Sequence, residues 1–264
     1  MRLVRFAIGE QVRCGIVEGD RVRELLRPYY EGLTAMKTTH ALAGLALLAP
    51  TRPSKMLCVG LNYRDHAAEM GKPIPDEPVL FMKPTSALAG PGQPIVYPKG
   101  VGRVDYEAEL AVVVGRRCRG VPLEEAGECI LGYTCFNDVT ARDLQAKDGQ
   151  WTRAKGFDTF GVVGPWIETD PGDVDHLAIT CRVNGQVRQQ SNTDQLIFHS
   201  RHLVAWASRI MTLEPGDVIA TGTPAGIGPL DPGDEVQVEV EGIGVLTNPV
   251  VAECDKSPKP AAVL

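Results

Sequence analysis

The stretch Asp105-Tyr-Glu107-Ala-Glu109-Leu-Ala-Val-Val-Val114 combines two acidic side chains with an unbroken apolar run from Leu110 onward. Such a run is typical of a strand that is buried on both faces. Successive side chains of a strand point to opposite faces, so Glu107 and Glu109 leave the same face. Two like charges at the edge of a core repel each other and lose hydration, and a hard divalent cation removes both costs. The stretch therefore predicts a buried strand with a metal site at its start, the alternative being a solvated strand end with two exposed acids.

A third acidic residue follows a second apolar segment. Residues 132–136 carry no charge before Asn137 and Asp138, and acids at strand ends are frequent in functional sites because rigid elements hold them in place. With Glu107 and Glu109, Asp138 would supply three oxygen ligands and leave positions open for water and substrate, which suits Mg²⁺ or Mn²⁺. Alone, Asp138 is equally consistent with a turn or cap residue.

Further apolar segments are short and are separated by turns. The chain has 28 Gly and 20 Pro residues, which favour many short elements, and Asn184-Gly185 between β-branched residues predicts a two-residue hairpin. A single long amphipathic helix is predicted over residues 199–211. Strands that are not regularly separated by helices of about ten to fifteen residues argue against a doubly wound sheet and predict a mixed, β-rich α+β fold. The buried stripe of the helix is predicted to consist of Leu203, Ala207, Ile210 and Met211.

The first fifty residues differ in pattern from the rest. Strand candidates at 3–8, 14–17 and 21–23 are separated by glycines, as in a β-meander, and the Leu- and Ala-rich segment 38–48 predicts a helix. The stretch Pro50-Thr-Arg-Pro53 then interrupts the pattern. We therefore expect a small N-terminal β-rich module over residues 1–53, a catalytic domain over 54–255 and a flexible tail over 256–264.

Composition excludes several classes of protein. The 264 residues are 44% hydrophobic and 23% charged, which excludes wholesale disorder. A formal net charge of −6 and an aromatic content of 6% offer neither the attraction nor the stacking surface that nucleic acid requires. The seven cysteines form no CxxC pair, as is typical of a reduced compartment. The start of the chain lacks the apolar core of a signal peptide, and the longest apolar stretch, 41–49, is too short for a membrane span. We expect a cytoplasmic protein that binds neither nucleic acid nor membrane.

A second group of candidate residues lies within residues 60–70. His66 and Glu69 are spaced to share one face of a helical turn, so that the carboxylate can orient and polarise the imidazole. Such a pair can act as a general base toward a carbon acid or water. A proline-rich loop follows and could act as a lid. Surface pairs with this spacing are common, so a purely structural ion pair is the alternative.

Three further side chains are candidates for holding an anion. Lys155 lies beside glycine and aromatic residues, and Arg142 follows Asp138 by four positions. The glycine-rich loop 219–228 presents Thr223 and backbone N–H groups after a strand, but it lacks the sequence of a phosphate-binding P-loop. A surface position is the alternative for the lysine, and nucleotide binding is the weakest interpretation of the loop.

Six motifs in this order resemble the fumarylacetoacetate hydrolase family. They are Asn62-Tyr-x-x-His66-x-x-Glu69, Pro78-Val-Leu-Phe-Met-Lys-Pro84, Asp105-Tyr-Glu-x-Glu-Leu110, Asn137-Asp-Val-Thr-Ala-Arg-Asp143, Ala154-Lys-Gly-Phe157 and Gly222-Thr-Pro-x-Gly-Ile-Gly228. The resemblance extends from about Lys55 to about Val251 and implies the mixed β-roll fold of that family and a homodimer. The preceding residues resemble the short leading module of bacterial members with a single roll.

The resemblance also implies roles for individual residues. The family's metal, Mg²⁺ or sometimes Mn²⁺ or Ca²⁺, would be bound by Glu107, Glu109 and Asp138. The implied catalytic residues are His66, Glu69 and Lys155. The residues implied to lie near the substrate are Arg142, Gln145 and Thr223. A distal carboxylate of the substrate could be received by Lys83, Lys155 or Arg142.

Members of this family act on small 2-oxo or 2-enol carboxylic acids, but the reaction differs between branches. They include acylpyruvate C–C hydrolases, oxaloacetate decarboxylases, and the isomerase/decarboxylase of aromatic-acid catabolism that acts on 2-hydroxyhepta-2,4-diene-1,7-dioate and its 5-carboxy precursor. The amino-acid sequences of residues 56–63 and 156–160 resemble those of the bacterial isomerase/decarboxylase branch. We therefore expect a Mg²⁺-dependent isomerase or decarboxylase of 2-hydroxydienoic or 2-oxo dicarboxylates. Acylpyruvate hydrolysis and oxaloacetate decarboxylation are the alternatives, and a non-catalytic, metal-stabilised binding module is the alternative from another class.

Overall fold

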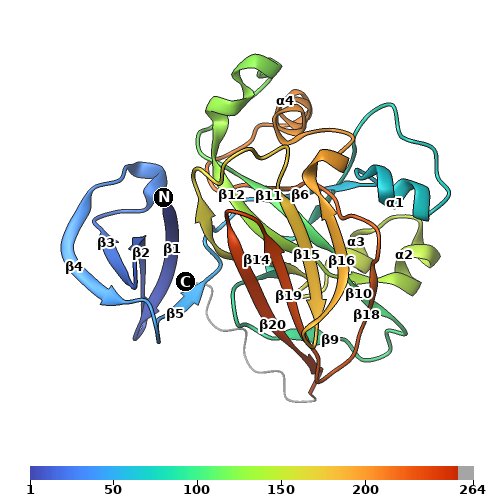
Figure 1. Cartoon of the computed structure of the whole chain (residues 1–264), viewed down its shortest axis with the longest axis horizontal. Helices are drawn as coiled ribbons and strands as arrows, with labels where there is room; N and C mark the ends of the chain where they lie inside the picture. The colour runs from blue at the N-terminus through green and yellow to red at the C-terminus, as the bar shows by residue number, and fades with distance from the viewer. Residues whose placement is uncertain (255–264) are drawn as a thin grey trace.

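Three β-sheets and four short α-helices are present in residues 1–254, the part of the chain that the computed structural model describes (Figure 1). The twelve strands of the largest sheet are β1 (Arg2–Ile8), β2 (Gln11–Glu18), β3 (Arg21–Leu25), β4 (Ala35–Ala41), β5 (Ala46–Leu48), β6 (Met56–Gly60), β7 (Val79–Lys83), β8 (Leu88–Ala89), β11 (Ala108–Val114), β12 (Ile130–Asp138), β14 (Gly161–Glu168) and β17 (Val218–Ala220). The second sheet contains β9 (Ile95–Tyr97), β15 (Ala178–Val183), β16 (Gln186–Asn192), β19 (Glu235–Val240) and β20 (Gly244–Ala252). The third contains β10 (Val104–Tyr106), β13 (Thr140–Ala141) and β18 (Gly228–Leu230).

The helices are short and lie between strands. The α-helices are α1 (Arg64–Glu69), α2 (Arg142–Asp148), α3 (Thr152–Lys155) and α4 (Ser200–Ile210). The 3-10 helices are η1 (Tyr29–Glu31), η2 (Thr85–Ala87), η3 (Leu123–Cys129) and η4 (Thr193–Gln195). Figure 1 shows β1 to β5 at one side of the molecule and α1, α2 and α3 at the opposite side. The structure is therefore mostly β, as the sequence predicts.

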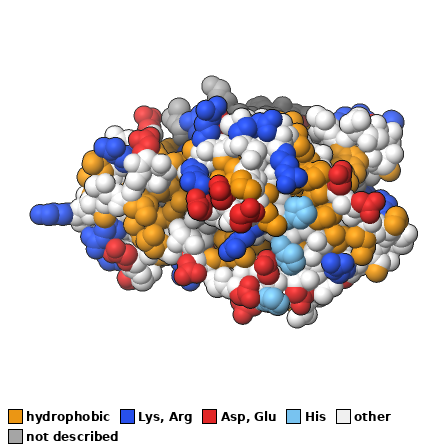
Figure 2. Space-filling model, turned by 90° about the horizontal axis from the view of Figure 1, so that it is seen from above, with side chains coloured by type: hydrophobic (Ala, Val, Ile, Leu, Met, Phe, Trp, Pro, Cys, Tyr) orange, Lys and Arg blue, Asp and Glu red, His pale blue; other side chains and the backbone are white. Residues whose placement is uncertain are grey.

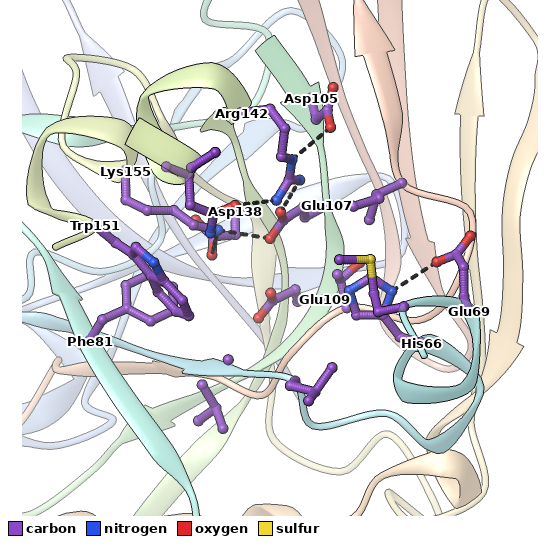
Figure 3. A pocket seen from close by; sticks show the side chains of 18 of the residues that line it. His66, Glu69, Phe81, Asp105, Glu107, Glu109, Asp138, Arg142, Trp151 and Lys155 are labelled. Carbon is purple, nitrogen blue, oxygen red and sulfur yellow. Dashed lines mark hydrogen bonds and ion pairs between the residues drawn. The ribbon is translucent and has the colours of Figure 1, made fainter. Parts of the chain in front are cut away.

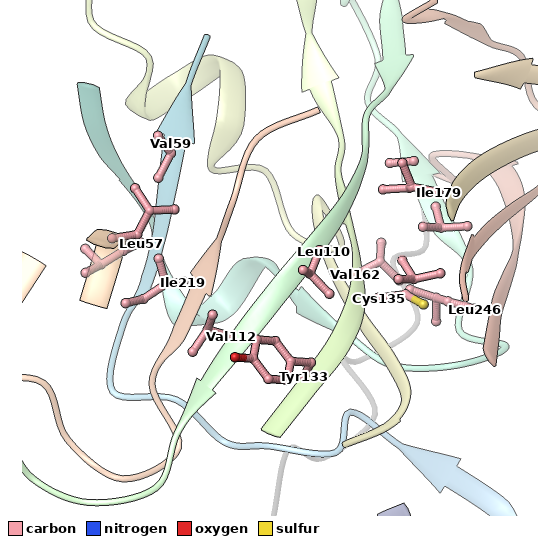
Figure 4. Packing of buried hydrophobic residues seen from close by; sticks show 14 of the residues in the cluster. Leu57, Val59, Leu110, Val112, Tyr133, Cys135, Val162, Ile179, Ile219 and Leu246 are labelled. Atoms are coloured by element: carbon pink, nitrogen blue, oxygen red, sulfur yellow. The ribbon is translucent and has the colours of Figure 1, made fainter. Parts of the chain in front are cut away.

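The largest sheet has the strand order β4-β3-β2-β1-β14-β12-β11-β17-β6-β7. Neighbours on this path are antiparallel except β17 and β6, which are parallel. Packed against the centre of this sheet is the second sheet, and the main hydrophobic cluster fills the space between them. Figure 4 shows this packing, in which Leu110 and Val162 point toward Ile179 and Leu246.

Both faces of β11 are buried, as its apolar run predicts. Leu110 belongs to the main cluster between the two sheets, whereas Ala111 belongs to a second, smaller cluster on the opposite face of the strand. Glu107 and Glu109 alternate with the residues of the main cluster and therefore lie on the side of the smaller one. This alternation places the acidic side chains on the face of the sheet away from the main core.

The N-terminal residues differ from the prediction in one segment. Residues 38–48 form parts of β4 and β5 rather than a helix. Thr39 pairs with Arg23 of β3, and Gly44, with a φ of 87°, lies in the turn between the two strands. Ladder hydrogen bonds to β1 and β3 outweigh the weak helical preference of Leu and Ala. Because β1 pairs with β14, the N-terminal strands continue the largest sheet.

Two other local predictions can be compared with the structure. The hairpin between β15 and β16 turns at Asn184 and Gly185, whose φ values of 52° and 76° confirm the predicted two-residue turn. Helix α4 is present, but Ile210 is 52% exposed instead of buried. The buried face is rotated toward Ser208, whose Oγ accepts a hydrogen bond from the backbone N–H of Val121 (2.9 Å). The tail predicted over 256–264 lies outside the described residues.

Two observations bear on the surface of the protein. In residues 1–254, no helix has both the length and the apolar character needed to cross a membrane, and the longest, α4, has 11 residues. Acidic and basic side chains are interspersed over the face shown in Figure 2, without a broad field of either sign.

Candidate active site

Strand register brings the three predicted carboxylates together. Ala108 of β11 pairs with Asn137 of β12, and the backbone N–H of Asp138 donates to the carbonyl of Glu107 (2.9 Å). Asp138 thus lies directly beside Glu107, and Glu109 follows on the same face. One carboxylate oxygen from each residue lies within 4.8 Å of the other two. The three side chains are almost completely buried, with exposed fractions of 6%, 1% and 1% for Glu107, Glu109 and Asp138.

Three cationic side chains contact two of these carboxylates, and Figure 3 shows two of the three, Arg142 and Lys155. Lys155, at the end of α3, donates to Glu107 Oε2 (2.8 Å) and to Asp138 Oδ2 (2.7 Å). Arg142, at the start of α2, pairs with the other oxygen of Glu107. Nζ of Lys83 lies 2.6 Å from Asp138 Oδ1. Glu107 and Asp138 are therefore neutralised by the protein itself.

Glu109 has a different environment. Its Oε2 accepts a hydrogen bond from the backbone N–H of Gly222 (2.7 Å), and no cationic side chain of residues 1–254 pairs with it. Burial and the neighbouring charges of Asp138 and Glu107 raise its pKa well above the usual value. Burial also opposes ionisation of Glu107, but Lys155 and Arg142 outweigh it and lower the pKa of Glu107 to about 2. Positive charge is thus lacking on the side of the cluster where Glu109 lies.

This donor set fits a divalent cation. All three donors are carboxylate oxygens, which hard cations such as Mg²⁺ and Mn²⁺ prefer, and their separation allows one ion to contact all of them. A cation placed there would also supply the charge that Glu109 lacks. The chemistry of the site therefore agrees with the expected divalent metal without selecting among Mg²⁺, Mn²⁺ and Ca²⁺.

His66 and Glu69 form the predicted pair on α1. Nδ1 of His66 lies 2.9 Å from Oε2 of Glu69, and Oε1 of Glu69 accepts from the backbone N–H of Gly226 (3.0 Å). With Nδ1 donating to the carboxylate, the neutral imidazole carries its proton on Nδ1 and leaves Nε2 free to accept one. In the view of Figure 3, His66 and Lys155 lie on opposite sides of the pocket that both line with Glu109. The pair is therefore oriented as a general base facing the carboxylates.

A cavity of about 600 Å³ joins these groups. The carboxylates line one part of it, and Phe81 and Trp151 form an apolar wall in which their rings meet edge to face at 5.1 Å. Nζ of Lys155 lies 5.0 Å from the centroid of the Phe81 ring. The cavity therefore combines a charged region with an apolar wall that suits a short carbon chain.

Nine of the ten predicted site residues line this cavity. They are His66, Glu69, Glu107, Glu109, Asp138, Arg142, Gln145, Lys155 and Thr223. The exception is Lys83, which is 1% exposed and donates to the carbonyl oxygens of Val139 (2.9 Å), Lys155 (2.8 Å) and Phe160 (2.8 Å). All three protons of its amine are donated to backbone carbonyls, so none remains for a substrate carboxylate. Lys83 therefore stabilises Asp138 through its positive charge.

Several residues at the site were not singled out from the sequence. Asp105 is fully buried and accepts from both Arg103 (2.6 Å) and Arg142 (2.9 Å), so it fixes Arg142 in place. Leu61 lines the cavity with a φ of 52°, a conformation that is uncommon for a residue other than glycine. Asp105 opens the acidic motif and could have been found from it, whereas the conformation of Leu61 has no signal in the sequence. The other cavity-lining residues that were missed include Phe81, Trp151, Lys72 and Arg103.

Comparison with known proteins agrees with the family resemblance noted in the sequence. Residues 55–251 match the family described as fumarylacetoacetate (FAA) hydrolase C-terminal, and residues 1–50 match the one described as Rv2993c-like, N-terminal. A mitochondrial oxaloacetate tautomerase of Xenopus laevis is 42% identical over 250 residues, covering 88% of this chain and 78% of that protein.

The solved structures that cover 96% of this chain include an isomerase and a hydrolase. The 2-hydroxyhepta-2,4-diene-1,7-dioate isomerase of Mycobacterium marinum is 45% identical, with a TM-score of 0.89 over 99% of its own chain. The maleylpyruvate hydrolase of Sphingobium sp. SYK-6, solved with manganese(II) and pyruvate, is 33% identical, with a TM-score of 0.81 over all of its own chain. The chain therefore belongs to the fumarylacetoacetate hydrolase family and is an enzyme.

Proposed function

We propose that this enzyme is a metal-dependent isomerase of 2-oxo or 2-hydroxydienoic dicarboxylates, such as 2-hydroxyhepta-2,4-diene-1,7-dioate. The observation that carries the proposal is the His66–Glu69 pair, which faces a buried cluster of three carboxylates across one cavity. The similarity to an isomerase of this substrate and to an oxaloacetate tautomerase supports the same class of reaction, a proton moved between carbon and oxygen or along a conjugated chain.

Glu107, Glu109 and Asp138 are the proposed metal ligands, with Mg²⁺ as the preferred ion. A divalent cation held by them supplies Lewis-acid stabilisation for negative charge on the 2-oxygen of the substrate. Lys155 lies between two of these carboxylates and keeps a positive charge, because Asp138 and Glu107 raise its pKa even though burial opposes it. We assign Lys155 the role of stabilising, through its positive charge, the negative charge that develops on the oxygen of the substrate's enolate.

His66 is the proposed base. Its Nε2 removes a proton from a carbon of the substrate and returns it further along the chain, while Glu69 stabilises the imidazolium that forms in between. Glu69 is held in position for this role because its second carboxylate oxygen accepts a hydrogen bond from the backbone N–H of Gly226. The apolar wall of Phe81 and Trp151 excludes water from the conjugated part of the substrate.

The carboxylate next to the 2-oxygen is assigned to Arg142, Gln145 and Thr223. Oε1 of Gln145 accepts from Arg142 Nη1 (2.6 Å), so the amide N–H groups of Gln145 remain as donors for a substrate. A second, distal carboxylate needs a cation that the protein does not already use. Among the described lysines and arginines of the cavity, Lys72 is exposed and has no ion-pair partner, so we assign it this role.

An absorbance assay tests the proposal. 2-Hydroxyhepta-2,4-diene-1,7-dioate and oxaloacetate are offered with Mg²⁺, with Mn²⁺ and with a chelator. Decay of the conjugated dienol band without shortening of the carbon chain, dependent on added metal, is the expected result. Absence of turnover of both substrates with Mg²⁺ and with Mn²⁺ would disprove the proposal.

Hydrolysis of a C–C bond is the second candidate. The similarity to a maleylpyruvate hydrolase favours it, because the same His66–Glu69 pair can activate water toward a distal carbonyl. With an acylpyruvate added to the assay above, release of pyruvate without carbon dioxide would select this reaction, whereas release of carbon dioxide together with pyruvate from oxaloacetate would select decarboxylation. We further propose that the enzyme is cytoplasmic and forms a homodimer. Size-exclusion chromatography with light scattering tests the homodimer.

A further inference from the structure

Gln189 is a buried polar residue that no motif of the sequence points to. It lies on β16 and is 1% exposed, whereas Arg188 and Gln190 on either side of it are exposed. The pairing of β15 and β16 shifts register between Cys181 and Arg182, so that Cys181 pairs with Gln189 while Arg182 pairs with Val187. Such bulges re-aim side chains next to functional sites. The Gln189 amide is directed between β11 and the loop that carries Thr223.

The hydrogen bonds of this amide are fully determined by its neighbours. Oε1 accepts from the backbone N–H of Ala108 (3.0 Å), and Nε2 donates to the carbonyl of Pro224 (2.9 Å) and to Oγ1 of Thr223 (2.8 Å). A backbone N–H only donates and a carbonyl only accepts, so the amide cannot be flipped. Both protons of Nε2 are therefore used, and Oγ1 of Thr223 must be the acceptor.

This direction has a consequence for Thr223. Its hydroxyl accepts from Gln189, lines the cavity, and has no acceptor for its own proton among residues 1–254. The proton is consequently available to a group inside the cavity, and an anionic oxygen is the acceptor that binds it most strongly. We propose that Gln189 is a positioning residue that fixes Thr223 as a hydrogen-bond donor to the carboxylate of the bound substrate.

Gln189 also fixes where this donor lies. Ala108, which it holds through Oε1, stands between Glu107 and Glu109, so one side chain joins the strand of the carboxylates to the loop of Thr223. Together with the bond from the Gly222 N–H to Glu109, this buried amide thereby fixes the distance between the carboxylate-binding hydroxyl and the metal-binding oxygens. The inference rests on the proposed function in that it takes the ligand of Thr223 to be the substrate's carboxylate.

Substitution of Gln189 tests the inference. Gln189→Glu keeps the acceptor for Ala108 but cannot donate, so the Thr223 proton turns toward the new carboxylate and away from the substrate. Gln189→Met removes both functions at similar size. Loss of a hydrogen bond to a charged group predicts a rise in KM of about 10- to 100-fold with a smaller change in kcat. The matched controls Gln190→Glu and Gln190→Met, on the exposed face of the same strand, are expected to stay within about twofold of the parent.

A double-mutant cycle separates positioning from general damage. Thr223→Val removes the donor itself, so Gln189→Met is expected to raise KM less than about twofold in that background. Mn²⁺ uptake, measured by calorimetry, is expected to stay unchanged in the Gln189 variants. Equal effects of Gln189→Met in both backgrounds, an unchanged KM, or a loss of Mn²⁺ uptake that parallels the rise in KM would each overturn the inference. Gln189→Glu carries the test alone if Gln189→Met does not fold.

Oxalate binding tests the positioning role of Gln189 without requiring turnover of any substrate. Oxalate is a planar, unreactive dianion, and its affinity in the presence of Mn²⁺ is expected to fall about 10- to 100-fold in Gln189→Glu and to be unchanged in Gln190→Glu. If no 2-oxo acid is turned over but oxalate binding depends on Gln189, the proposed function fails and the positioning role stands. If oxalate binds the parent and Gln189→Glu alike, or binds neither, the positioning role fails.

Discussion

The two sides of the cavity are built in opposite ways. The carboxylate floor, which we define as Glu107, Glu109 and Asp138, lies on adjacent strands, is at most 6% exposed and is held by several hydrogen bonds and ion pairs. The dyad helix, α1 with His66 and Glu69, has six residues, and the Glu69 side chain is 40% exposed. One backbone N–H, that of Gly226, ties Glu69 to the rest of the site.

This difference assigns binding to one side and proton movement to the other. A floor fixed by sheet register can hold a cation without rearrangement, which is the requirement for electrostatic stabilisation. A short, partly exposed helix can shift by small amounts as substrate enters and leaves. Changes in the floor should therefore remove metal binding and stability together, whereas changes in the dyad helix should affect turnover alone.

The largest effect is expected for Asp138→Ala. The substitution leaves the buried amines of Lys83 and Lys155 without one of their counter-charges, which predicts a loss of about 3–5 kcal/mol in the free energy of unfolding. Metal uptake and turnover should disappear as well. Urea denaturation and Mn²⁺ calorimetry measure the two effects, with the partly exposed Asp148→Asn as control. Intact Mn²⁺ uptake in Asp138→Ala would contradict the ligand assignment.

The next effect is expected for His66→Ala. Removal of the base should lower kcat by about 10²- to 10⁴-fold, while Mn²⁺ uptake and the unfolding midpoint stay those of the parent. His176→Ala is a matched control, because His176 pairs with Asp173 at 2.9 Å in the same three-residue spacing but is 65% exposed and outside the cavity. Equal activity of the two variants would exclude His66 as the base.

A smaller effect is expected for Gly226→Ala. A Cβ at this position would lie 2.5 Å from the carbonyl of Arg188, so the loop must move and the N–H that holds Glu69 moves with it. We expect kcat to fall about tenfold with unchanged metal uptake. Gly233→Ala is the control, since Gly233 also has a positive φ but a Cβ there meets nothing within 4 Å. An equal loss of activity in Gly226→Ala and Gly233→Ala would contradict the role of the Gly226 N–H in holding Glu69.

The smallest effect is expected for Lys72→Ala. Lys72 is exposed, so the loss of its charge should raise KM for a dicarboxylate by only about two- to fivefold. KM for an acylpyruvate with an uncharged tail should not change. Lys147→Ala removes the same charge outside the cavity and serves as control. Equal changes of KM for the charged and uncharged substrates would rule out the assignment to the distal carboxylate.

The parts of the molecule that the sequence predicts well are those set by local periodicity. Alternation along β11 places Glu107 and Glu109 on one face, and the three-residue spacing brings His66 to Glu69 at 2.9 Å. Both follow from neighbours in the chain, so no knowledge of tertiary contacts is needed.

The parts that the sequence does not predict depend on long-range contacts. The segment 38–48 forms strands because β3 and β1 offer it partners, and Lys83 is buried because three carbonyls from distant residues converge on its amine. Gln189 is 81 positions from Ala108 and 34 from Thr223, so its role is visible only when the three meet in space. Local patterns thus identify which residues react, and tertiary contacts decide which residues hold them.

The pairing of β1 with β14 has a practical consequence for shortened forms of the enzyme. Without residues 1–53, β14 would lose its β1 partner at Ile167 and Glu168, and Trp166, which packs against the cluster of Val4, Phe6 and Val22, would be uncovered. An open strand edge beside an exposed indole is a template for self-association. A truncated catalytic domain should therefore tend to aggregate even though every residue of its reaction chemistry is present.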